Sequence, residues 1–233
     1  MLKIDCLEAF YGEVQVLFGV SLEVHESEVV SVVGANGAGK TTLLNAISGT
    51  VERAGSVHFG GQEIGGLAAH EVALRGLVQV PEGRRLFPFM TVQENLELGA
   101  FNPRARNSRA ENLDKVFTLM PRLRDRATQL AGSMSGGEQQ MCAVGRALMA
   151  MPRMIMFDEP TLGLAPIMVD TVFKLVTEIK ATGATILLVE QNVKHSLALS
   201  DRGYVLENGR IAVHGPAREL LTDPRLKAAY LGG

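Results

Sequence analysis

The sequence is short of the features that mark secreted, metal-binding and membrane-spanning proteins. It has no tryptophan and two cysteines, Cys6 and Cys142, which show neither CxxC nor metal-ligand spacing. We expect both to be buried or neutral thiols in a reducing compartment. No apolar run approaches the ~20 residues that span a bilayer. The first residues lack the basic start, apolar stretch and cleavage site of a secretion signal. The sequence therefore predicts a soluble protein, held at a membrane only through another protein.

A strong excess of one charge is also absent. The net charge is −2 and charged residues make up 21% of the 233 positions, so composition gives no electrostatic case for nucleic acid binding. The basic run at 121–126 is interpreted as a solvated face. Hydrophobic residues make up 46%, which is typical of a globular protein. A chain of this length forms one large domain or two small ones.

What the sequence does contain is an alternation of short strands and amphipathic helices. Apolar, largely β-branched runs predict buried strands at 28–34, 154–157 and 185–189, with helices between them. This alternation predicts an α/β fold with a parallel sheet. Turns containing Gly–Gly and Asn–Gly predict hairpins at 56–64 and 204–213, which we interpret as an added antiparallel β layer.

The middle of the chain is mainly helical in pattern. It contains a second capping-box spacing, at Thr91 and Glu94, and a polar stretch at 101–109 that we interpret as a connector. We predict a single domain with an inserted helical subdomain. Its core would comprise residues 1–89 and 152–233, and the subdomain residues 90–151.

A glycine-rich loop follows the first predicted strand. The stretch "GANGAGKT" at 34–41 fits the pattern G-x-x-x-x-G-K-T between a strand and a helix. Glycines let backbone N–H groups turn toward phosphate oxygens, and the helix N-terminus adds partial positive charge. Lys40 would reach the β- and γ-phosphates and Thr41 would ligate Mg²⁺; an ordinary glycine turn is the alternative. The nucleotide-binding residues predicted from this loop are Gly34, Asn36, Gly37, Ala38, Gly39, Lys40, Thr41 and Thr42.

Two adjacent acids follow the strand at 154–157. The carboxyl ends of strands in α/β sheets bind ligands. Asp158 therefore suits Mg²⁺, through water, and Glu159 suits a base that activates water. The alternative is a pair of capping or salt-bridging acids, but the glycine-rich loop favours the chemical interpretation.

The stretch "MSGGEQQM" at 134–141 begins a predicted helix. Ser135 and Glu138 have the S-x-x-E spacing of a capping box. A cap does not require Gly136 and Gly137, which cost helix stability relative to alanine. Bare backbone at a helix start suits the close approach of a phosphate, and a cap and a phosphate site can share one helix start.

These motifs together resemble the ATP-binding subunits of ABC transporters, over essentially the whole chain. "MSGGE" is similar to that family's signature LSGGQ, which contacts the γ-phosphate of ATP held by the opposite subunit. The resemblance implies a P-loop NTPase core with a parallel sheet, an antiparallel β layer and a helical subdomain, with ATP and Mg²⁺ as ligands. It also implies that Tyr11 stacks on adenine, against the alternative of a core tyrosine. The signature residues implied in binding are Ser135, Gly136, Gly137 and Glu138.

A narrower resemblance points to the smaller ATPase subunit of branched-chain amino-acid importers. The stretches that carry it are "VPEGRRLFP" at 80–88, "MSGGEQQM", "DEPTLGLAP" at 158–166, "LLVEQN" at 187–192 and the ending "AYLGG".

Three positions depart from the general ABC pattern. Glu82 stands at the usual Q-loop glutamine position, since Gln79 comes three residues too early. Ala165 stands at the D-loop aspartate position, and Gln191 at the switch-histidine position with His195 out of register, as expected of a surface histidine. Glu82 still offers an oxygen to Mg²⁺, and Gln191 can donate a hydrogen bond to a γ-phosphate but cannot become cationic. The resemblance thus implies the catalytic residues Lys40, Glu159 and Gln191 and the metal ligands Thr41, Glu82 and Asp158.

The function implied by the resemblance is that of an ATP-hydrolysing motor subunit of an ABC importer for branched-chain amino acids. Its partners would be a second ABC ATPase subunit, identical or related, permease subunits and, indirectly, a solute-binding protein, with no nucleic acid. It would be cytoplasmic, on the inner face of the cell membrane. The alternatives are a nucleotide-switched subunit with little turnover, a subunit for another solute such as urea or amides, and a non-transport ABC ATPase.

Overall fold

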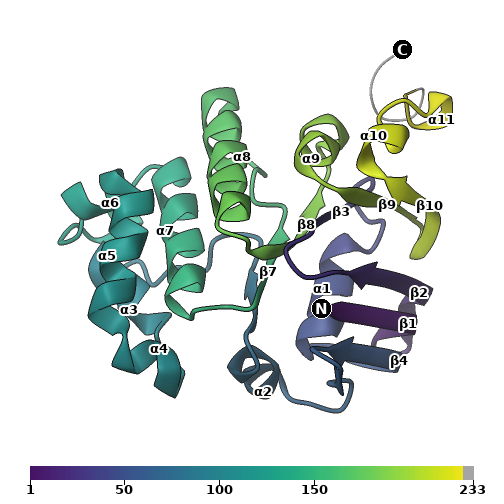
Figure 1. Cartoon of the computed structure of the whole chain (residues 1–233), viewed down its shortest axis with the longest axis horizontal. Coiled ribbons are helices and arrows are strands. Elements are labelled where there is room, and N and C mark those ends of the chain that lie inside the picture. Colours follow the sequence, from purple (N-terminus) through teal and green to yellow (C-terminus); the bar gives the residue numbers. More distant parts are fainter. Residues whose placement is uncertain (228–233) are drawn as a thin grey trace.

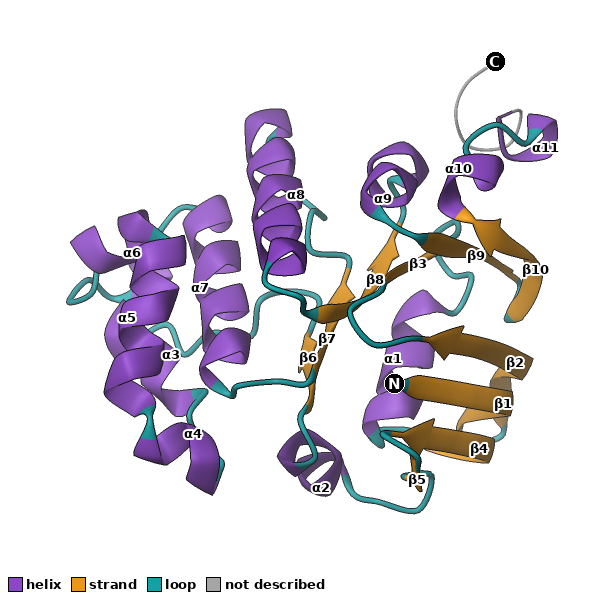
Figure 2. Ribbon diagram, viewed as in Figure 1, coloured by secondary structure: helices purple, strands orange, loops and turns teal. Residues whose placement is uncertain are grey.

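The main sheet of the molecule is six-stranded. The computed structural model describes residues 1–227, so the ending "AYLGG" lies outside the described residues. The strand order is β10-β9-β3-β8-β7-β6, in which β10 is antiparallel to β9 and all other neighbours are parallel (Figure 2). The predicted parallel α/β sheet is confirmed. Its strands are β3 (Val29–Val33), β6 (Leu77–Val80), β7 (Met154–Asp158), β8 (Thr185–Glu190), β9 (Arg202–Glu207) and β10 (Arg210–Pro216).

A second sheet, in the order β2-β1-β4-β5, is antiparallel. The hairpin predicted at 56–64 belongs to it, and Gly60 and Gly61 both adopt positive φ at its turn. The hairpin at 204–213 also forms, but its assignment to the antiparallel layer is wrong. Because β9 is buried from Gly203 to Leu206, it pairs in parallel with β3 and extends the main sheet. The strands of the second sheet are β1 (Leu2–Tyr11), β2 (Val14–Val24), β4 (Glu52–Phe59) and β5 (Gln62–Glu63).

Helices cover both faces of the main sheet (Figure 1). Along β8, Leu187 and Val189 belong to a core shared with α1 and the antiparallel sheet, while Ile186 and Leu188 belong to a core shared with α7 and α8. No helix within residues 1–227 combines the length and the apolarity needed to cross a membrane. Outside the inserted segment the helices are α1 (Lys40–Ser48), α2 (Ala69–Leu74), α8 (Pro166–Ala181), α9 (Val193–Leu199), α10 (Ala217–Leu220) and α11 (Pro224–Leu226).

The segment between β6 and β7 is helical, and because these two strands are neighbours it leaves and rejoins the sheet at one place (Figure 1). The interpretation of 101–109 as a connector is wrong. Asn102 accepts a hydrogen bond from the N–H of Ala105 at 2.8 Å and Pro103 occupies the first turn, so a short helix forms there. The exact limits of the subdomain stay a prediction. Its helices are α3 (Val92–Leu98), α4 (Pro103–Asn107), α5 (Arg109–Leu119), α6 (Pro121–Asp125), a 3₁₀ turn (Ala131–Ser133) and α7 (Gly136–Met149).

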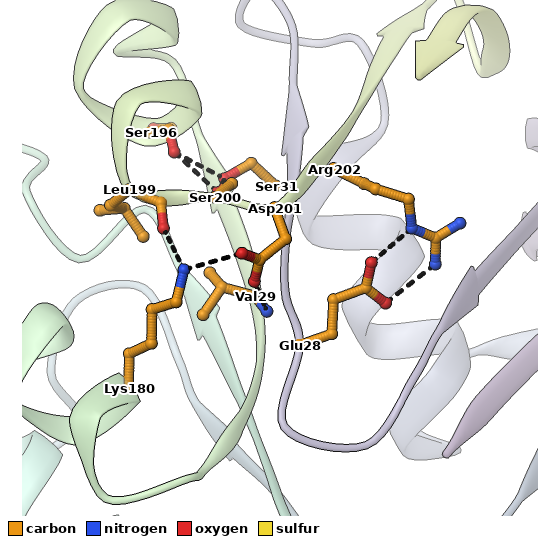
Figure 3. Close-up of polar contacts among 9 residues, drawn as sticks. All are labelled: Glu28, Val29, Ser31, Lys180, Ser196, Leu199, Ser200, Asp201 and Arg202. Carbon is orange, nitrogen blue, oxygen red and sulfur yellow. Dashed lines mark hydrogen bonds and ion pairs between the residues drawn. The ribbon is translucent and has the colours of Figure 1, made fainter. Parts of the chain in front are cut away.

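Side-chain contacts fix the amino end of β3, the end remote from the glycine-rich loop (Figure 3). Asp201 accepts from the N–H of Val29 at 2.9 Å and from Nζ of Lys180 at 3.0 Å. Glu28 pairs with the guanidinium of Arg202. Burial raises the pKa of Glu28, but the hydrogen bonds from Arg202 and the backbone outweigh it, so the net direction is down. These contacts tie β3 to the start of β9.

The two cysteines differ in environment. Cys142 is buried in α7, and burial raises its pKa to about 12, as expected of a neutral structural thiol. Cys6 is exposed, so a buried position is wrong for that residue. Cys6 lies where the β1 register is irregular and has a positive φ, which the alternation of the sequence does not reveal.

Candidate functional site

The glycine-rich loop connects β3 to the first turn of α1. Gly37 and Gly39 adopt φ of 79° and 106°, a region that favours glycine. A Cβ on Gly39 would lie 2.9 Å from Leu17 Cδ2, and one on Gly34 only 2.3 Å from the carbonyl oxygen of Leu206. The glycines are therefore needed both for the turn and for the close approach of neighbouring backbone.

Lys40 begins α1 and points back into the loop. Its side chain is 3% exposed, and the ammonium donates to the carbonyl oxygens of Gly34 at 2.8 Å and Ala35 at 2.9 Å. It also pairs with Oε1 of Glu159 at 3.0 Å. A phosphate approaching the loop therefore has to compete with these partners for the lysine.

Thr41 and Asp158 bring α1 and β7 together. The Thr41 hydroxyl donates to Oδ1 of Asp158 at 2.9 Å. Burial raises the pKa of Asp158 to about 6, and the negative charges of Glu82 and Glu159 add to the effect against the Thr41 hydrogen bond. Thr41, Asp158 and Glu82 line one cavity of about 410 Å³. Hydroxyl and carboxylate oxygens of this kind fit a hard divalent cation, although the same cavity is also lined by Arg85.

Glu159 lies at a turn with unusual backbone geometry. Its φ is 44°, a left-handed conformation that is uncommon for a residue with a side chain, and its N–H donates to the carbonyl of Val189 at 2.9 Å. This turn directs the carboxylate toward Lys40. The cavity that both residues line, about 390 Å³, is bordered by Val16, Asn36, Gly37, Gly39, Lys40, Thr41, Thr42, Glu82, Glu159 and Leu162.

Several predicted residues lie outside the lining of this cavity. Tyr11 is 49% exposed at the end of β1, and Val16 of the same hairpin forms the wall instead. Gln191 is exposed just after β8. His195 is exposed and stacks on Phe173 with ring centroids 5.1 Å apart, as expected of a surface histidine. The roles of Tyr11 and Gln191 stay predictions.

Glu82 stands in a loop with an unusual backbone. Gly83, Arg84 and Arg85 all have positive φ, and Arg146 of α7 donates to the carbonyl oxygens of Arg84 at 3.1 Å and Arg85 at 2.7 Å. These two hydrogen bonds connect the loop that carries Glu82 to α7, the helix that begins after Ser135. The sequence of this loop, one glycine followed by two arginines, does not reveal that three consecutive residues adopt positive φ.

Gln79 lines the same cavity as Glu82, but its side chain is engaged by α1. It lies within β6, accepts from the Ser48 hydroxyl at 2.6 Å and donates to Asn45 at 3.3 Å.

The signature segment forms the predicted capping box at the start of α7. Glu138 Oε2 accepts from the N–H and the hydroxyl of Ser135, at 3.0 and 2.8 Å. Its other oxygen pairs with Arg126 at 2.8 Å. The hydrogen bond from the Ser135 hydroxyl, with help from Arg126, lowers the pKa of Glu138. Arg126 therefore has a partner that the solvated-face interpretation did not foresee.

The two signature glycines have neighbours within the same chain. A Cβ on Gly136 would lie 3.1 Å from the Arg84 guanidinium, and one on Gly137 would lie 2.1 Å from Met168 Cε. A side chain at Gly137 would therefore require the flexible side chain of Met168, on α8, to move. Within the described residues, none from 135 to 138 lines the cavity at Lys40, so one chain does not join the two glycine-rich segments there.

Glu190, the last residue of β8, was not predicted from the sequence to belong to the site. It is 2% exposed and accepts hydrogen bonds from Thr161 and from the backbone beyond β8. The signal was present, because an acid ends the otherwise apolar run "TILLVE".

Comparison with known proteins gives consistent matches. Residues 17–162 match the family described as ABC transporter. The chain is 47% identical to the high-affinity branched-chain amino acid transport ATP-binding protein BraG of Pseudomonas aeruginosa, over 100% of both chains. It is 37% identical to the probable branched-chain amino acid transport ATP-binding protein LivF of Archaeoglobus fulgidus, over 100% of this chain and 99% of the relative.

Solved structures agree. A nucleotide-free ATP-binding cassette from an ABC transporter matches with a TM-score of 0.87 at 30% identity, covering 100% of this chain and 99% of the other. A dimeric bacterial ABC transporter cassette matches with a TM-score of 0.77 at 28% identity, covering 94% of this chain and 99% of the other.

Proposed function

The chain belongs to the ABC transporter family, and from that premise we propose that it is the ATP-hydrolysing subunit of an importer for branched-chain amino acids. One observation carries the hydrolytic part. Lys40, Thr41, Asp158 and Glu159 come from two segments far apart in the sequence and are joined by direct contacts at the carboxyl edge of the sheet. The names of the two relatives support the choice of solute.

Each residue of the site has a role in this proposal. Lys40 and the N–H groups of residues 34–42 bind the phosphates, with Tyr11 against the adenine. Thr41, Asp158 and Glu82 would hold Mg²⁺, which supplies charge neutralisation between the phosphates when bound. Glu159 accepts the proton of the attacking water, and Gln191 donates a hydrogen bond to the γ-phosphate.

A dimer would complete the site. The signature segment, Ser135–Glu138, would face the ATP bound by a second ABC ATPase subunit, identical or related. A solved cassette of similar fold is itself dimeric, which supports this arrangement.

Permease subunits would dock beside the helical segment. An apolar cavity of about 410 Å³ lies there between β6, α3 and α7, with Phe87, Leu98 and Phe101 exposed around it. Docking would hold the chain at the inner face of the membrane, and a solute-binding protein would act on the permease from the other side.

A mixing experiment tests the shared site. Lys40→Ala chains bind ATP poorly, and Ser135→Arg chains present a blocked signature. Each alone is expected to be inactive, but in a mixed dimer one of the two composite sites is intact and ATPase activity should return in part. A mixture that dimerises by sizing without any recovery would contradict the composite site. If the working dimer is a heterodimer, the two substitutions are placed on the two different subunits.

Transport tests the solute. The chain reconstituted with its permease subunits should support ATP-dependent uptake of leucine, isoleucine or valine and not of urea or amides. Uptake of urea or an amide with no uptake of these amino acids would move the assignment to the alternative solute.

A nucleotide-switched subunit with little turnover is the second candidate. The exposed, neutral Gln191 at the switch position favours it. Phosphate release by the parent chain at no more than the Glu159→Gln rate would establish the switch.

A further inference from the structure

Glu190 lies between two segments that the proposed reaction uses. It ends β8, and β8 is parallel to β7, which ends beside Glu159. Its carboxylate accepts from the N–H of Thr161 at 3.0 Å and from the Thr161 hydroxyl at 2.7 Å. It also accepts from the N–H of Gln191 at 3.2 Å and of Asn192 at 3.4 Å.

Four donors converge on this one buried carboxyl group, and a carboxylate can accept a hydrogen bond from each of them. A carboxylate offers acceptor sites only, whereas a glutamine would turn an NH₂ donor against some of these donors. Burial raises the pKa of Glu190, and the hydrogen bonds from Thr161 and Asn192 oppose this without reversing it, while the nearby charge of Glu159 adds to the rise. A buried charge that is kept by this many hydrogen bonds constrains the groups that donate them.

The donors belong to the two loops that carry the reacting groups. Thr161 is two residues after Glu159, whose own N–H is held by the carbonyl of Val189 on β8. Gln191 follows Glu190 directly. One side chain therefore fixes the turn of the general base and the backbone of the γ-phosphate donor relative to each other.

We propose that Glu190 is a positioning residue that holds Glu159 and Gln191 in register for ATP hydrolysis. The inference rests on the proposed function, since it gives these two residues their roles. The competing explanation is a carboxylate that only stabilises the edge of the sheet. Positioning lowers kcat while leaving ATP binding intact, whereas loss of stability alone changes the unfolding transition and not the chemistry.

The test uses the complete chain, with its ABC partner if the working dimer is a heterodimer. Glu190→Gln should lower kcat for phosphate release about 10- to 100-fold, the usual effect of a small misplacement of reacting groups. The KM for ATP and the affinity for a fluorescent ATP analogue should stay within about twofold, because Glu190 does not line the cavity at Lys40.

A double-mutant cycle shows whether Glu190 acts through Gln191. In a Gln191→Ala background, Glu190→Gln should cost less than it does in the parent chain, because only Glu159 is then left for it to position. Multiplicative losses in the cycle would overturn the route through Gln191.

Two substitutions of Thr161 test the same contact without requiring that the Glu190→Gln chain folds. Thr161→Val removes the hydroxyl bond, keeps the shape and should reduce kcat about 3- to 10-fold. Thr161→Ser keeps the hydroxyl and should restore the parent rate. Parent-like kcat in both Glu190→Gln and Thr161→Val would overturn the inference alone. A parent chain no faster than Lys40→Ala would overturn the proposed function as well.

Discussion

The ion pair between Lys40 and Glu159 means that substitution of Glu159, the proposed base, should strengthen nucleotide binding as well as stop hydrolysis. The two charges lie 3.0 Å apart, with side chains 3% and 9% exposed. ATP has to take the lysine away from this partner and also tolerate the charge of Glu159 near its γ-phosphate. Glu159→Gln removes the charge and keeps the shape.

The magnitude follows from the contact that is weakened. A hydrogen bond to a charged group contributes roughly 1.5–3 kcal/mol, and the neutral amide oxygen of glutamine retains about 1 kcal/mol of it. The difference of about 0.5–2 kcal/mol should make ATP bind about 2- to 30-fold more tightly. Hydrolysis should fall about 10²- to 10⁴-fold, the usual contribution of a positioned base.

Titration calorimetry with ATP under conditions that keep the chain monomeric measures the first effect, and phosphate release the second. The control is the same substitution in a Lys40→Ala background, where no lysine remains to be freed and the gain from the pair should vanish. ATP affinity in Glu159→Gln that equals or falls below the parent value would refute the reasoning. An equal gain in both backgrounds would assign the effect to phosphate repulsion instead.

Four further outcomes are expected. At pH 8, iodoacetamide should modify Cys6 and leave Cys142 unmodified in the folded chain, as read by mass spectrometry, because burial keeps the Cys142 thiol protonated; equal labelling would contradict this. Glu138→Ala should cost about 1–2 kcal/mol of unfolding free energy at pH 7; because the pKa of Glu138 is lowered in the fold, the cost should shrink in urea titrations as the pH falls below 4.5 and through that lowered pKa. Arg126→Ala, which removes one partner of the Glu138 carboxylate, should lower the free energy of unfolding by less than about 1 kcal/mol. A larger loss would show that this ion pair is stronger than a solvent-exposed one. Asp158→Asn should abolish ATPase activity yet raise unfolding free energy at pH 8 by up to about 3 kcal/mol, from the gap between 3.8 and about 6, with the gain fading as pH falls through 6 toward 4.

The local features were predictable because each is encoded within a few consecutive residues. The loop at 34–41 carries its own glycines and lysine, and the strand before it and the helix after it have their own apolar patterns. The capping box of Ser135 and Glu138 closes within one helical turn, so its spacing alone fixes the contact. The hairpin turn at Asn208 and Gly209 is likewise local.

Errors arose where a segment's partner lies elsewhere in the chain. The hairpin at 204–213 has a clear turn, but the turn says nothing about the third strand that β9 joins. The error at 101–109 was of another kind, because the cap and the proline that make the short helix lie within the polar stretch itself. The local sequence of a segment does not specify which other segment it will pair with.

By itself the sequence determined the alternation of strands and helices, the phosphate loop, the two acids after β7 and the helix start at Ser135. Only the tertiary structure decided that Lys40 is paired with Glu159, that Thr41 contacts Asp158, and that Glu190 receives the donors of Thr161. These contacts join positions about 30 to 120 residues apart. Spacing along the chain does not specify such contacts, because they depend on which strands become neighbours and on which side chains are left to satisfy each other when water is excluded.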